Sequence, residues 1–480
     1  MSEGAAKKEE KPRKFQAIRG TRDLLPPETA LWNRVEQTAQ EVFASYGFGE
    51  IRLPIFEETE LFRRSVGAET DVGKEMWYTF QDPLDLDQII KESQEAGPNP
   101  FKDKYGDLRA VLFEVQRRVQ ALTLRPEATA SVCRAYIEHN MQQLPQPVKL
   151  YYTGPMFRRE RPQKGRYRQF YQIGAEVLEV VRREAAEQDW EKEVRKDAAI
   201  DAEVIEMLMA FFAKLELSGT TLYINSIGHN GPDCRRAYMG KLYNELLKIK
   251  GKLGADSQRR IETNPLRVLD SKLESEQSYI ETLPHIVDYL CPACAAHYAS
   301  LKRELDLRGV KYRENWRLVR GLDYYMRTTF EITAQGLGSQ DAVCGGGRYD
   351  GLVELLGGPP TKGIGFAIGE DRLILSLQES GKAPGEQGRD VYIAWMGENA
   401  RATAVRAAKT LRNAGFSVEL PPVEQKFGKA LGQADKLGAK YALILGDNEV
   451  TSGEWTLKML ADGTQRKLPE SLLIEELRKK

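Results

Sequence analysis

Several features are scarce or absent in this chain of 480 residues, and each absence excludes a class of protein. Five cysteines are too few and too scattered for a disulfide scaffold, so we expect a reducing, cytoplasmic location. No apolar run is long enough for a membrane span, and the longest, around Ile205 to Phe212, fits a buried amphipathic helix. The 70 basic and 70 acidic residues cancel, which excludes a polybasic nucleic-acid binder.

Length and composition predict an ordinary globular protein of two or three domains. Residues 1–14 are charged and have no apolar core, so we expect a flexible tail and not a signal peptide. Residues 381–390, GKAPGEQGRD, have the composition of a linker. Strands and helices alternate beyond it, which predicts a small α/β domain with a parallel sheet and a hairpin turn at Asp462-Gly463.

The stretch from Met156 to Gln172, MFRRERPQKGRYRQFYQ, concentrates positive charge. Six basic residues stand against one acid, Glu160, for a local net charge of +5. Strands are predicted on both sides, over residues 149–157 and 169–177, with the basic loop joining an antiparallel pair. Arginine suits phosphate, but on charge alone a solvated basic hairpin or a nucleic-acid contact is the commoner explanation.

The stretch LTLRPEATA, Leu122 to Ala130, predicts a strand that Pro126 halts. Glu127 and Thr129 would then project just beyond the strand end, where a carboxylate and a hydroxyl could receive a substrate ammonium. The alternative is that Glu127 merely stabilises the N-terminus of a following helix.

Further elements follow from pattern. A helix is predicted over residues 31–46, and a strand over 51–56, IRLPIF. Aromatic and β-branched residues predict a strand over residues 318–332, LVRGLDYYMRTTFEI. Three consecutive glycines in GSQDAVCGGGRYDGL, residues 338–352, pack nothing themselves, so a ligand or another backbone should lie against them. Neither a Walker loop nor a dinucleotide fingerprint is present.

Two regions carry no chemistry that the sequence reveals. Residues from about 228 to 309 are helical and charged in pattern, and Pro83–Arg118 is a charged insertion. Within the first region, Cys291-Pro-Ala-Cys294 and His297 suggest zinc, but a structural site needs four ligands and no fourth is apparent nearby. Buried or idle thiols are therefore the favoured interpretation, and we predict no metal site.

Several of these stretches together resemble one enzyme family. FRRERPQ…GRYRQF resembles motif 2 of the class II aminoacyl-tRNA synthetases, and GIGFAIGEDRLIL, with Asp371-Arg372 where the family usually has Glu-Arg, resembles motif 3. LRPEATA resembles the LRPEGT signature of the histidine enzymes, with Ala128 in place of glycine. RGLDYY and GGGRYDG resemble signatures that distinguish histidine enzymes from other class II members. The resemblance covers nearly the whole chain apart from the tail and Pro83–Arg118.

The resemblance implies an α+β catalytic domain over residues 15–386, an antiparallel sheet with flanking helices of the class II synthetase type. A helical insertion over residues 228–311 would interrupt it and embrace the tRNA acceptor arm. An anticodon-binding α/β domain would occupy residues 387–480. The helix over residues 31–46 and IRLPIF look like motif 1, through which the family forms homodimers, and no membrane association is expected.

The implied reaction activates L-histidine with ATP and Mg²⁺ to histidyl-adenylate and then transfers it to the histidine-specific tRNA. Arg158 and Arg320 would be catalytic, holding the α-phosphate from opposite sides. Besides Arg158, ATP would be bound by Glu160, Arg166, Phe170 and Arg372. Histidine would be bound by Glu127, Thr129, Gln172, Glu176, Tyr325 and Tyr349, with Glu176 and Tyr325 each meeting one imidazole nitrogen. Gln163 and Arg168 could approach the tRNA, and none of the chain's four histidines is needed.

Two alternatives remain open at this point. A non-enzymatic regulatory subunit of the histidine-biosynthetic phosphoribosyltransferase shares the fold and binds histidine, but that family generally lacks the anticodon-binding domain and erodes RGLDYY and GGRYDG. A class II synthetase for another amino acid, such as threonine or proline, is the second alternative. RGLDYY together with Glu176 argues against it.

Overall fold

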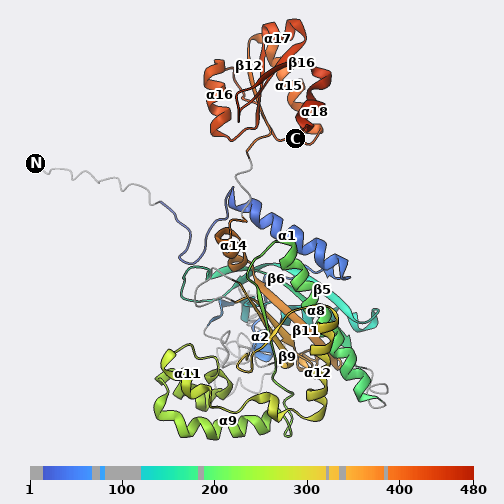
Figure 1. Ribbon diagram of the computed structural model, residues 1–480, viewed down its shortest axis with the longest axis vertical. Coiled ribbons are helices and arrows are strands. Elements are labelled where there is room, and N and C mark those ends of the chain that lie inside the picture. Colours follow the sequence, from blue (N-terminus) through green and yellow to red (C-terminus); the bar gives the residue numbers. More distant parts are fainter. Residues whose placement is uncertain are drawn as a thin grey trace, which may run out of the picture. The chain divides into compact units, whose positions relative to one another are not determined.

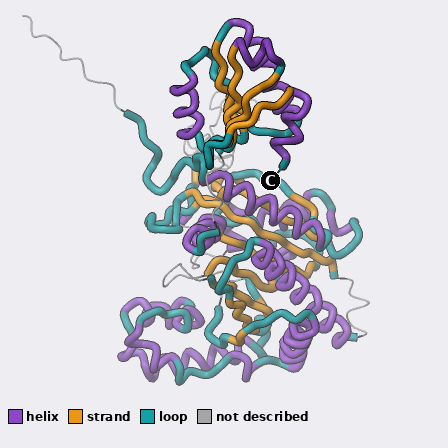
Figure 2. Tube along the Cα trace, turned by 45° about the horizontal axis from the view of Figure 1, so that its top comes forward, coloured by secondary structure: helices purple, strands orange, loops and turns teal. Residues whose placement is uncertain are grey.

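The computed structural model describes residues 14–66, 76–81, 121–181, 189–319, 324–334, 342–382 and 388–479. The chain divides into two compact units, one of Met1–Leu24 and Trp32–Ala383, the other of Leu25–Leu31 and Pro384–Lys480. The insertion Pro83–Arg118 and all but the last residue of the predicted tail lie outside the described residues. Figure 1 shows the elements of each unit, and Figure 2 distinguishes their helices from their strands.

The first unit is built on an eight-stranded sheet. Its strands, in spatial order, are β1 (Gly49–Glu50), β5 (Val148–Phe157), β6 (Gln169–Val180), β11 (Thr361–Gly369), β10 (Ala342–Arg348), β9 (Met326–Thr333), β7 (Thr221–Ser226) and β8 (Arg313–Glu314). The six inner strands pair antiparallel, and the two short edge strands β1 and β8 pair parallel to their neighbours. The predicted antiparallel sheet and the β5–β6 hairpin are therefore confirmed.

Long amphipathic helices flank this sheet. They are α1 (Glu28–Ser45), α8 (Trp190–Lys214), α12 (Pro292–Leu307) and α14 (Glu370–Glu379). Phe43 connects α1 and α8 with the sheet, because its ring lies 5.7 Å from Phe211 of α8 and 5.8 Å from Phe366 of β11. Burial of each such aromatic ring stabilises the fold by about 2 kcal/mol. These contacts therefore hold α1 and α8 on the sheet. The predicted helix over residues 31–46 is confirmed.

A smaller three-stranded sheet lies in the same unit, in the order β2 (Phe56–Glu58), β4 (Ala121–Leu124), β3 (Thr79–Gln81). Helix α2 (Thr59–Val66) follows β2 in the chain, and α6 (Thr129–Glu138) follows β4. The prediction of a strand over IRLPIF was wrong, because only Phe56 of it is in a strand. The carbonyls of Leu53 and Pro54 accept hydrogen bonds from the Arg125 guanidinium, at 3.0 and 3.2 Å, in place of ladder bonds.

A mainly helical segment follows β7, and its buried core also includes Ile227 and Tyr325 from outside the segment. It contains α9 (Arg235–Ile249), α10 (Ala255–Thr263) and α11 (Glu274–Ile280), joined by the short helices η3 (Lys250–Lys252), η4 (Pro265–Val268) and η5 (Ile286–Tyr289). Helix α12 lies inside the range predicted for the insertion, residues 228–311. It packs instead along α8 and against β9 (Figure 1), so the separate helical part ends before it.

The C-terminal unit is a five-stranded sheet covered by four helices. The strands, in order, are β13 (Val418–Glu419), β12 (Val391–Met396), β14 (Tyr441–Gly446), β15 (Glu454–Met459) and β16 (Gln465–Pro469). The helices are α15 (Glu398–Asn413), α16 (Phe427–Lys436), α17 (Asp447–Ser452) and α18 (Glu470–Arg478). Strand β12 pairs parallel with β13 and β14, and β15 and β16 form a hairpin around Asp462-Gly463. Both features match the prediction.

Among the described residues, no helix is both long enough and apolar enough to cross a bilayer.

Candidate active site

The centre of the large sheet has glycines where neighbouring side chains need space. On β11, a Cβ atom at Gly365 would overlap the Glu176 carboxylate of β6, and one at Gly363 would overlap the ring of Tyr349. On β10, a Cβ at Gly346 or Gly347 would strike the backbone oxygen of Gly365 or Thr328. The expectation that another backbone lies against these consecutive glycines is thus confirmed. The missing side chains leave room for a buried carboxylate and a tyrosine.

Glu176 lies at the bottom of this space and is 1% exposed. One carboxylate oxygen accepts a hydrogen bond from Thr129 Oγ1 at 2.7 Å, and the other accepts one from the Tyr349 hydroxyl at 2.5 Å. Burial raises the pKa of Glu176 to about 8, although both hydrogen bonds oppose the shift. Burial therefore favours the protonated form of this carboxyl near neutral pH.

Glu127 is held at the start of α6. Its carboxylate accepts the backbone N–H groups of Thr129, at 2.7 Å, and Ala130, at 3.1 Å. These N–H groups have no partner within the helix, so the side chain stabilises the helix N-terminus. Burial raises the pKa of Glu127, while these hydrogen bonds and the charge of Arg158 oppose the rise. The cap also fixes a buried carboxylate close to Glu176, so the structural and ligand-binding interpretations describe the same geometry.

Four tyrosines surround these carboxylates. The ring of Tyr324 lies 5.7 Å from that of Tyr349 and 4.8 Å from that of Tyr325. Burial, reinforced by Tyr325 and by the charges of Glu127 and Glu176, raises the pKa of Tyr324 well above its usual value. Burial, the charges of both carboxylates and Tyr325 likewise raise the pKa of Tyr152, on β5, well above its usual value. Glu176 and Tyr325 thus both lie near Tyr152 and Tyr324.

Gln172, on β6, has a buried side-chain oxygen with no hydrogen-bond partner among the described residues. A buried acceptor without a partner costs about 1–3 kcal/mol. Such a group in a pocket of carboxyl and hydroxyl groups is suited to receive N–H donors from a ligand.

The neighbouring basic group gathers three arginines around one acid. The Arg158 guanidinium lies over the ring of Phe170 at 4.9 Å, and its Nε donates to the Pro126 carbonyl at 2.9 Å. Arg158 and Arg166 each approach the Glu160 carboxylate to 3.8 Å. Burial lowers the pKa of Arg372, and the positive charges of Arg166 and Arg158 lower it further. The group keeps a net positive charge in a partly desolvated place, which favours an anion such as phosphate.

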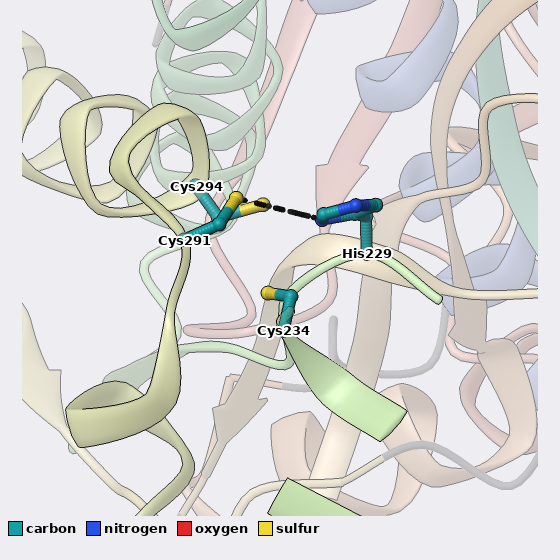
Figure 3. A group of neighbouring side chains, drawn as sticks. All are labelled: His229, Cys234, Cys291 and Cys294. Atoms are coloured by element: carbon teal, nitrogen blue, oxygen red, sulfur yellow. Dashed lines mark hydrogen bonds between the residues drawn. The ribbon is translucent and has the colours of Figure 1, made fainter. Parts of the chain in front are cut away.

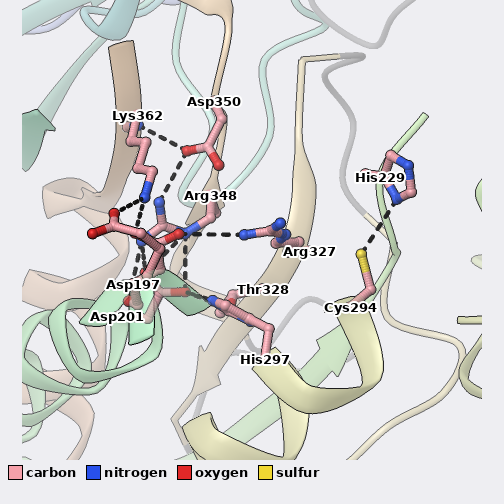
Figure 4. Close-up of polar contacts among 12 residues, drawn as sticks. Asp197, Asp201, His229, Cys294, His297, Arg327, Thr328, Arg348, Asp350 and Lys362 are labelled. Atoms are coloured by element: carbon pink, nitrogen blue, oxygen red, sulfur yellow. Dashed lines mark hydrogen bonds and ion pairs between the residues drawn. The ribbon is translucent and has the colours of Figure 1, made fainter. Parts of the chain in front are cut away.

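A polar network on α8, β9, β10 and α12 supports the pocket (Figure 4). Arg348 donates to Asp201 at 2.5 Å and to Asp350 at 2.9 Å, and Asp350 also accepts the backbone N–H of Gly363 at 3.0 Å. Burial alone would raise the pKa of Asp201, but the charges and hydrogen bonds of Arg348 and His297 together outweigh burial and lower that pKa. Because Tyr349 follows Arg348 directly, the network fixes the tyrosine that faces Glu176.

Comparison with known proteins points to one family. A family model described as histidyl-tRNA synthetase matches residues 105–373, and one described as anticodon binding domain matches residues 390–480. The histidine–tRNA ligases of Koribacter versatilis and Solibacter usitatus are each 48% identical to the chain, over 96% and 95% of it and over 95% and 96% of their own lengths. The crystal structure of apo S. aureus histidyl-tRNA synthetase matches with a TM-score of 0.71 and 33% identity, over 97% of this chain and all of that one.

The chain belongs to the histidyl-tRNA synthetase family. The class II fold predicted from the motifs is confirmed with it.

The departure from the family pattern in motif 3 has a structural explanation. Asp371 accepts the backbone N–H of Tyr171 at 3.0 Å and a hydrogen bond from Arg22 at 3.1 Å. The shorter acid thereby ties α14 to β6 and to the N-terminal segment. Arg372 follows on α14 and donates to the Ala342 carbonyl of β10 at 3.0 Å, beside the other arginines.

The structure brings most of the predicted site residues of this synthetase family member together, in two groups. Glu127, Thr129, Gln172, Glu176, Tyr325 and Tyr349 belong to the pocket, and Arg158, Glu160, Arg166, Phe170 and Arg372 to the basic group beside it. Arg320 lies outside the described residues. The strand predicted over residues 318–332 begins only at Met326, so Tyr324 and Tyr325 precede it.

The two residues predicted to meet tRNA differ in setting. Gln163 is exposed in the loop between β5 and β6, which a pair of backbone hydrogen bonds to Arg166 closes. The side chain of Arg168 packs against Gly20, and its backbone N–H donates to the Gly20 carbonyl at 2.7 Å. Arg168 therefore also holds the N-terminal segment.

Sequence reasoning missed Tyr152 and Tyr324. Tyr152 pairs across the strands with Gly174, where a Cβ would overlap its ring. An aromatic residue opposite a glycine in a predicted hairpin was the available signal. Tyr324 adjoins Tyr325 in the signature RGLDYY, but nothing in the sequence says which of two neighbouring tyrosines faces the pocket.

Proposed function

We infer that this chain is an ATP-dependent ligase that joins L-histidine to its cognate tRNA through a histidyl-adenylate. The observation that carries the inference is the buried Glu176, held between Thr129 and Tyr349 beside a cluster of arginines. The family membership of the chain agrees with it.

In the first step, the histidine carboxylate attacks the α-phosphate of ATP and pyrophosphate leaves. Two anions must approach each other, and negative charge develops on phosphoryl oxygens, so fixed cations are the main requirement. Arg158 is the described candidate for holding the α-phosphate, with Arg320 acting from the other side. Arg166 and Arg372 would hold the outer phosphates, Glu160 the adenine amine, and Phe170 the ring.

Phe170 is covered by the Arg158 guanidinium at 4.9 Å in the ligand-free protein. Adenine would therefore insert beside this cation or move it, and an arginine–aromatic pair can receive a base on either flat surface. Mg²⁺, when bound with ATP, would neutralise phosphate charge. It uses one or two carboxylates together with phosphate oxygens, and Glu331 fits because it acts electrostatically on Arg372.

Histidine would enter the glycine-lined pocket. Glu176 and Tyr325 would each meet one imidazole nitrogen, and the unpaired oxygen of Gln172 would accept from the ammonium together with Thr129 and Glu127. Tyr349 would keep Glu176 in place. An analogue without the imidazole nitrogens would leave these buried groups unpaired, which can reject it by about 10⁴–10⁵-fold.

In the second step, the aminoacyl group passes to the terminal adenosine 3′-hydroxyl of the tRNA. We assign residues 15–386 to catalysis, 228–311 to the acceptor arm and 387–480 to the anticodon. Gln163 and Arg168 would contact the tRNA near its acceptor end. We also propose that the protein acts as a cytoplasmic homodimer, since the short strand β1 that follows α1 is a sheet edge, where chains can pair.

The deciding test is histidine-dependent exchange of pyrophosphate into ATP. We expect exchange with histidine and none with threonine or proline, which separates this function from a ligase for another amino acid. The regulatory-subunit alternative predicts histidine binding without exchange. It is not favoured, because the chain matches the anticodon-binding model and relatives that are histidine–tRNA ligases.

Arg320→Ala should lose most adenylate formation, by at least about 10²-fold, because a cation at the reacting phosphate is removed. Circular dichroism and the unfolding midpoint should stay at wild-type values. Exchange at the wild-type rate in this variant would remove Arg320 from catalysis.

Deletion of the chain after Gly385 should impair tRNA charging more than adenylate formation, because the pocket lies wholly in the first unit. Charging and pyrophosphate exchange are measured on the same preparation. Equal loss of both would show that the C-terminal unit is needed for folding.

A further inference from the structure

Four potential metal ligands meet at the base of the helical insertion (Figure 3). The ligand atoms of His229, Cys234, Cys291 and Cys294 all lie within 4.8 Å of one another. All three cysteines are buried, and His229 is half-buried. Three of the five cysteines of the chain and one of its four histidines are thus gathered in one place.

This cluster corrects the ligand set considered from the sequence. His297 follows Cys294 by three residues, but its ring lies on the Asp201 network, with Nε2 3.3 Å from Asp201 Oδ2 (Figure 4). The histidine that meets the thiols is His229, 62 residues before Cys291 in the chain. With Cys234 it supplies the two ligands that the local spacing did not reveal.

The distances are close to those of a tetrahedral site. Zinc bonds of about 2.3 Å to sulfur and 2.0–2.1 Å to nitrogen put a sulfur and a nitrogen about 3.6 Å apart, and two sulfurs about 3.8 Å apart. Here His229 Nδ1 lies 3.4 Å from Cys294 Sγ and 3.6 Å from Cys291 Sγ. The widest ligand separation, at most 4.8 Å, needs a contraction of about 1 Å to close around an ion.

Two glycines make room for the ligands. Gly228 has a φ of +60°, and a Cβ there would lie 2.6 Å from Cys234 Sγ. A Cβ at Gly231 would overlap the imidazole of His229. The loop between β7 and α9 is therefore shaped so that the thiol and the ring can turn inward.

The surroundings also suit a bound cation. Nε2 of His229 faces Asp233 Oδ1 at 3.8 Å, on the side of the ring away from the thiols. A carboxylate in this position orients a metal-binding histidine and keeps the other nitrogen available as a ligand. Arg327 acts electrostatically on Cys294. Three thiolates and a neutral imidazole on Zn²⁺ carry a net charge of −1, which this arginine would balance.

We propose that His229, Cys234, Cys291 and Cys294 form a structural Zn²⁺ site. Sulfur and imidazole ligands in tetrahedral arrangement favour zinc among the common divalent ions, and four protein ligands leave no open position for catalysis. Packing of idle thiols does not account for an imidazole pointing at two of them, and a disulfide is absent because all five cysteines are free.

The position of the site indicates what the metal would stabilise. His229 and Cys234 follow β7 and precede α9, where the insertion begins, and Cys291 and Cys294 lie at the start of α12, where it ends. The ion would join the two ends of the insertion. Arg235, next to Cys234, donates to the Tyr325 carbonyl at 2.8 Å, so the same loop also supports the histidine pocket.

The test is the metal content of the full-length protein, purified without a metal-binding tag and measured by elemental mass spectrometry. We expect about one zinc ion per chain in the wild type, and less than about a tenth of that in Cys291→Ser, Cys294→Ser and His229→Ala. Cys133→Ser and His139→Ala are the matched controls and should retain the ion, since neither residue belongs to the cluster.

A second measurement covers variants that fail to fold. Wild-type protein stripped by a chelator and reloaded with Co²⁺ should show thiolate-to-cobalt charge transfer and the visible bands of a tetrahedral ion. Folded wild-type protein without metal, iron in place of zinc, or a Cys291–Cys294 disulfide would each overturn the proposal. Metal content is read independently of aminoacylation, so either proposal can fail without the other.

Discussion

Two carboxylates of this protein, Glu176 in the pocket and Asp201 behind it, are equally buried and behave oppositely. Their exposed fractions are 1% and 0%, so burial does not distinguish them. The pKa of Glu176 is raised to about 8, whereas that of Asp201 is lowered. The difference lies in their partners. Asp201 faces the guanidinium of Arg348 at 2.5 Å, while Glu176 has only hydroxyl donors.

The two carboxylates therefore differ in role: Asp201 supports the structure, and Glu176 is suited to ligand binding. A buried charge with a fixed counterion is complete and serves to hold neighbouring elements. A buried carboxyl without a counterion is costly to ionise. A cationic or N–H-donating ligand can lower that cost. Arg348 and Tyr349 are successive residues that reach the two carboxylates, so the ion pair of Asp201 helps to orient the tyrosine that faces Glu176.

The largest effect should come from removing the counterion. Arg348→Ala leaves the buried Asp201 without its guanidinium, beside only Thr328 and His297, and should destabilise the protein by about 3–5 kcal/mol, measured by urea unfolding. Arg195→Ala is the control, because Arg195 makes only an exposed pair with Glu191 at 3.8 Å on the same helix and should change stability by about 0–1 kcal/mol. Similar losses in both variants would mean that the Asp201 network is not special.

Glu176→Gln should instead reduce activity strongly and change stability little. The amide keeps the volume but loses the titrating group, so stability should change by less than about 1 kcal/mol while histidine-dependent pyrophosphate exchange falls by at least about 10²-fold. Glu179→Gln, three residues along β6, is the matched control and should exchange normally. A large loss of stability in Glu176→Gln with normal exchange would reverse the roles assigned to the two carboxylates.

The smallest effect concerns pH. Glu176 loses its proton near pH 8 in the empty pocket, and a complex that shares one proton between imidazole and carboxyl must then take one up. Histidine affinity should therefore weaken above pH 8, towards about tenfold per pH unit, and should not show this extra weakening in Glu176→Gln. Calorimetric titration between pH 7 and 9 measures both. Affinity that instead rises up to pH 8 would show that Glu176 binds neutral imidazole as a carboxylate.

The sequence alone predicted the local parts of the site correctly. The β5–β6 hairpin, the end of a strand before Pro126 and the close packing against the glycines of β10 all follow from periodicity, proline and glycine, which act over a few residues. The strand prediction failed where a side chain makes the hydrogen bonds that a neighbouring strand would otherwise make. IRLPIF has the composition of a strand, but the Arg125 guanidinium, about 70 residues away, takes its carbonyls.

What the sequence by itself determined is therefore the family, the layered fold and the residue types at the pocket, because each depends on short motifs. Only the tertiary structure decided which distant side chains meet: Tyr349 with Glu176, Arg348 with Asp201, and His229 with Cys291. These pairs are 173, 147 and 62 residues apart, and no periodicity encodes such separations. The sheet order brings them together, and burial then makes each pairing energetically decisive.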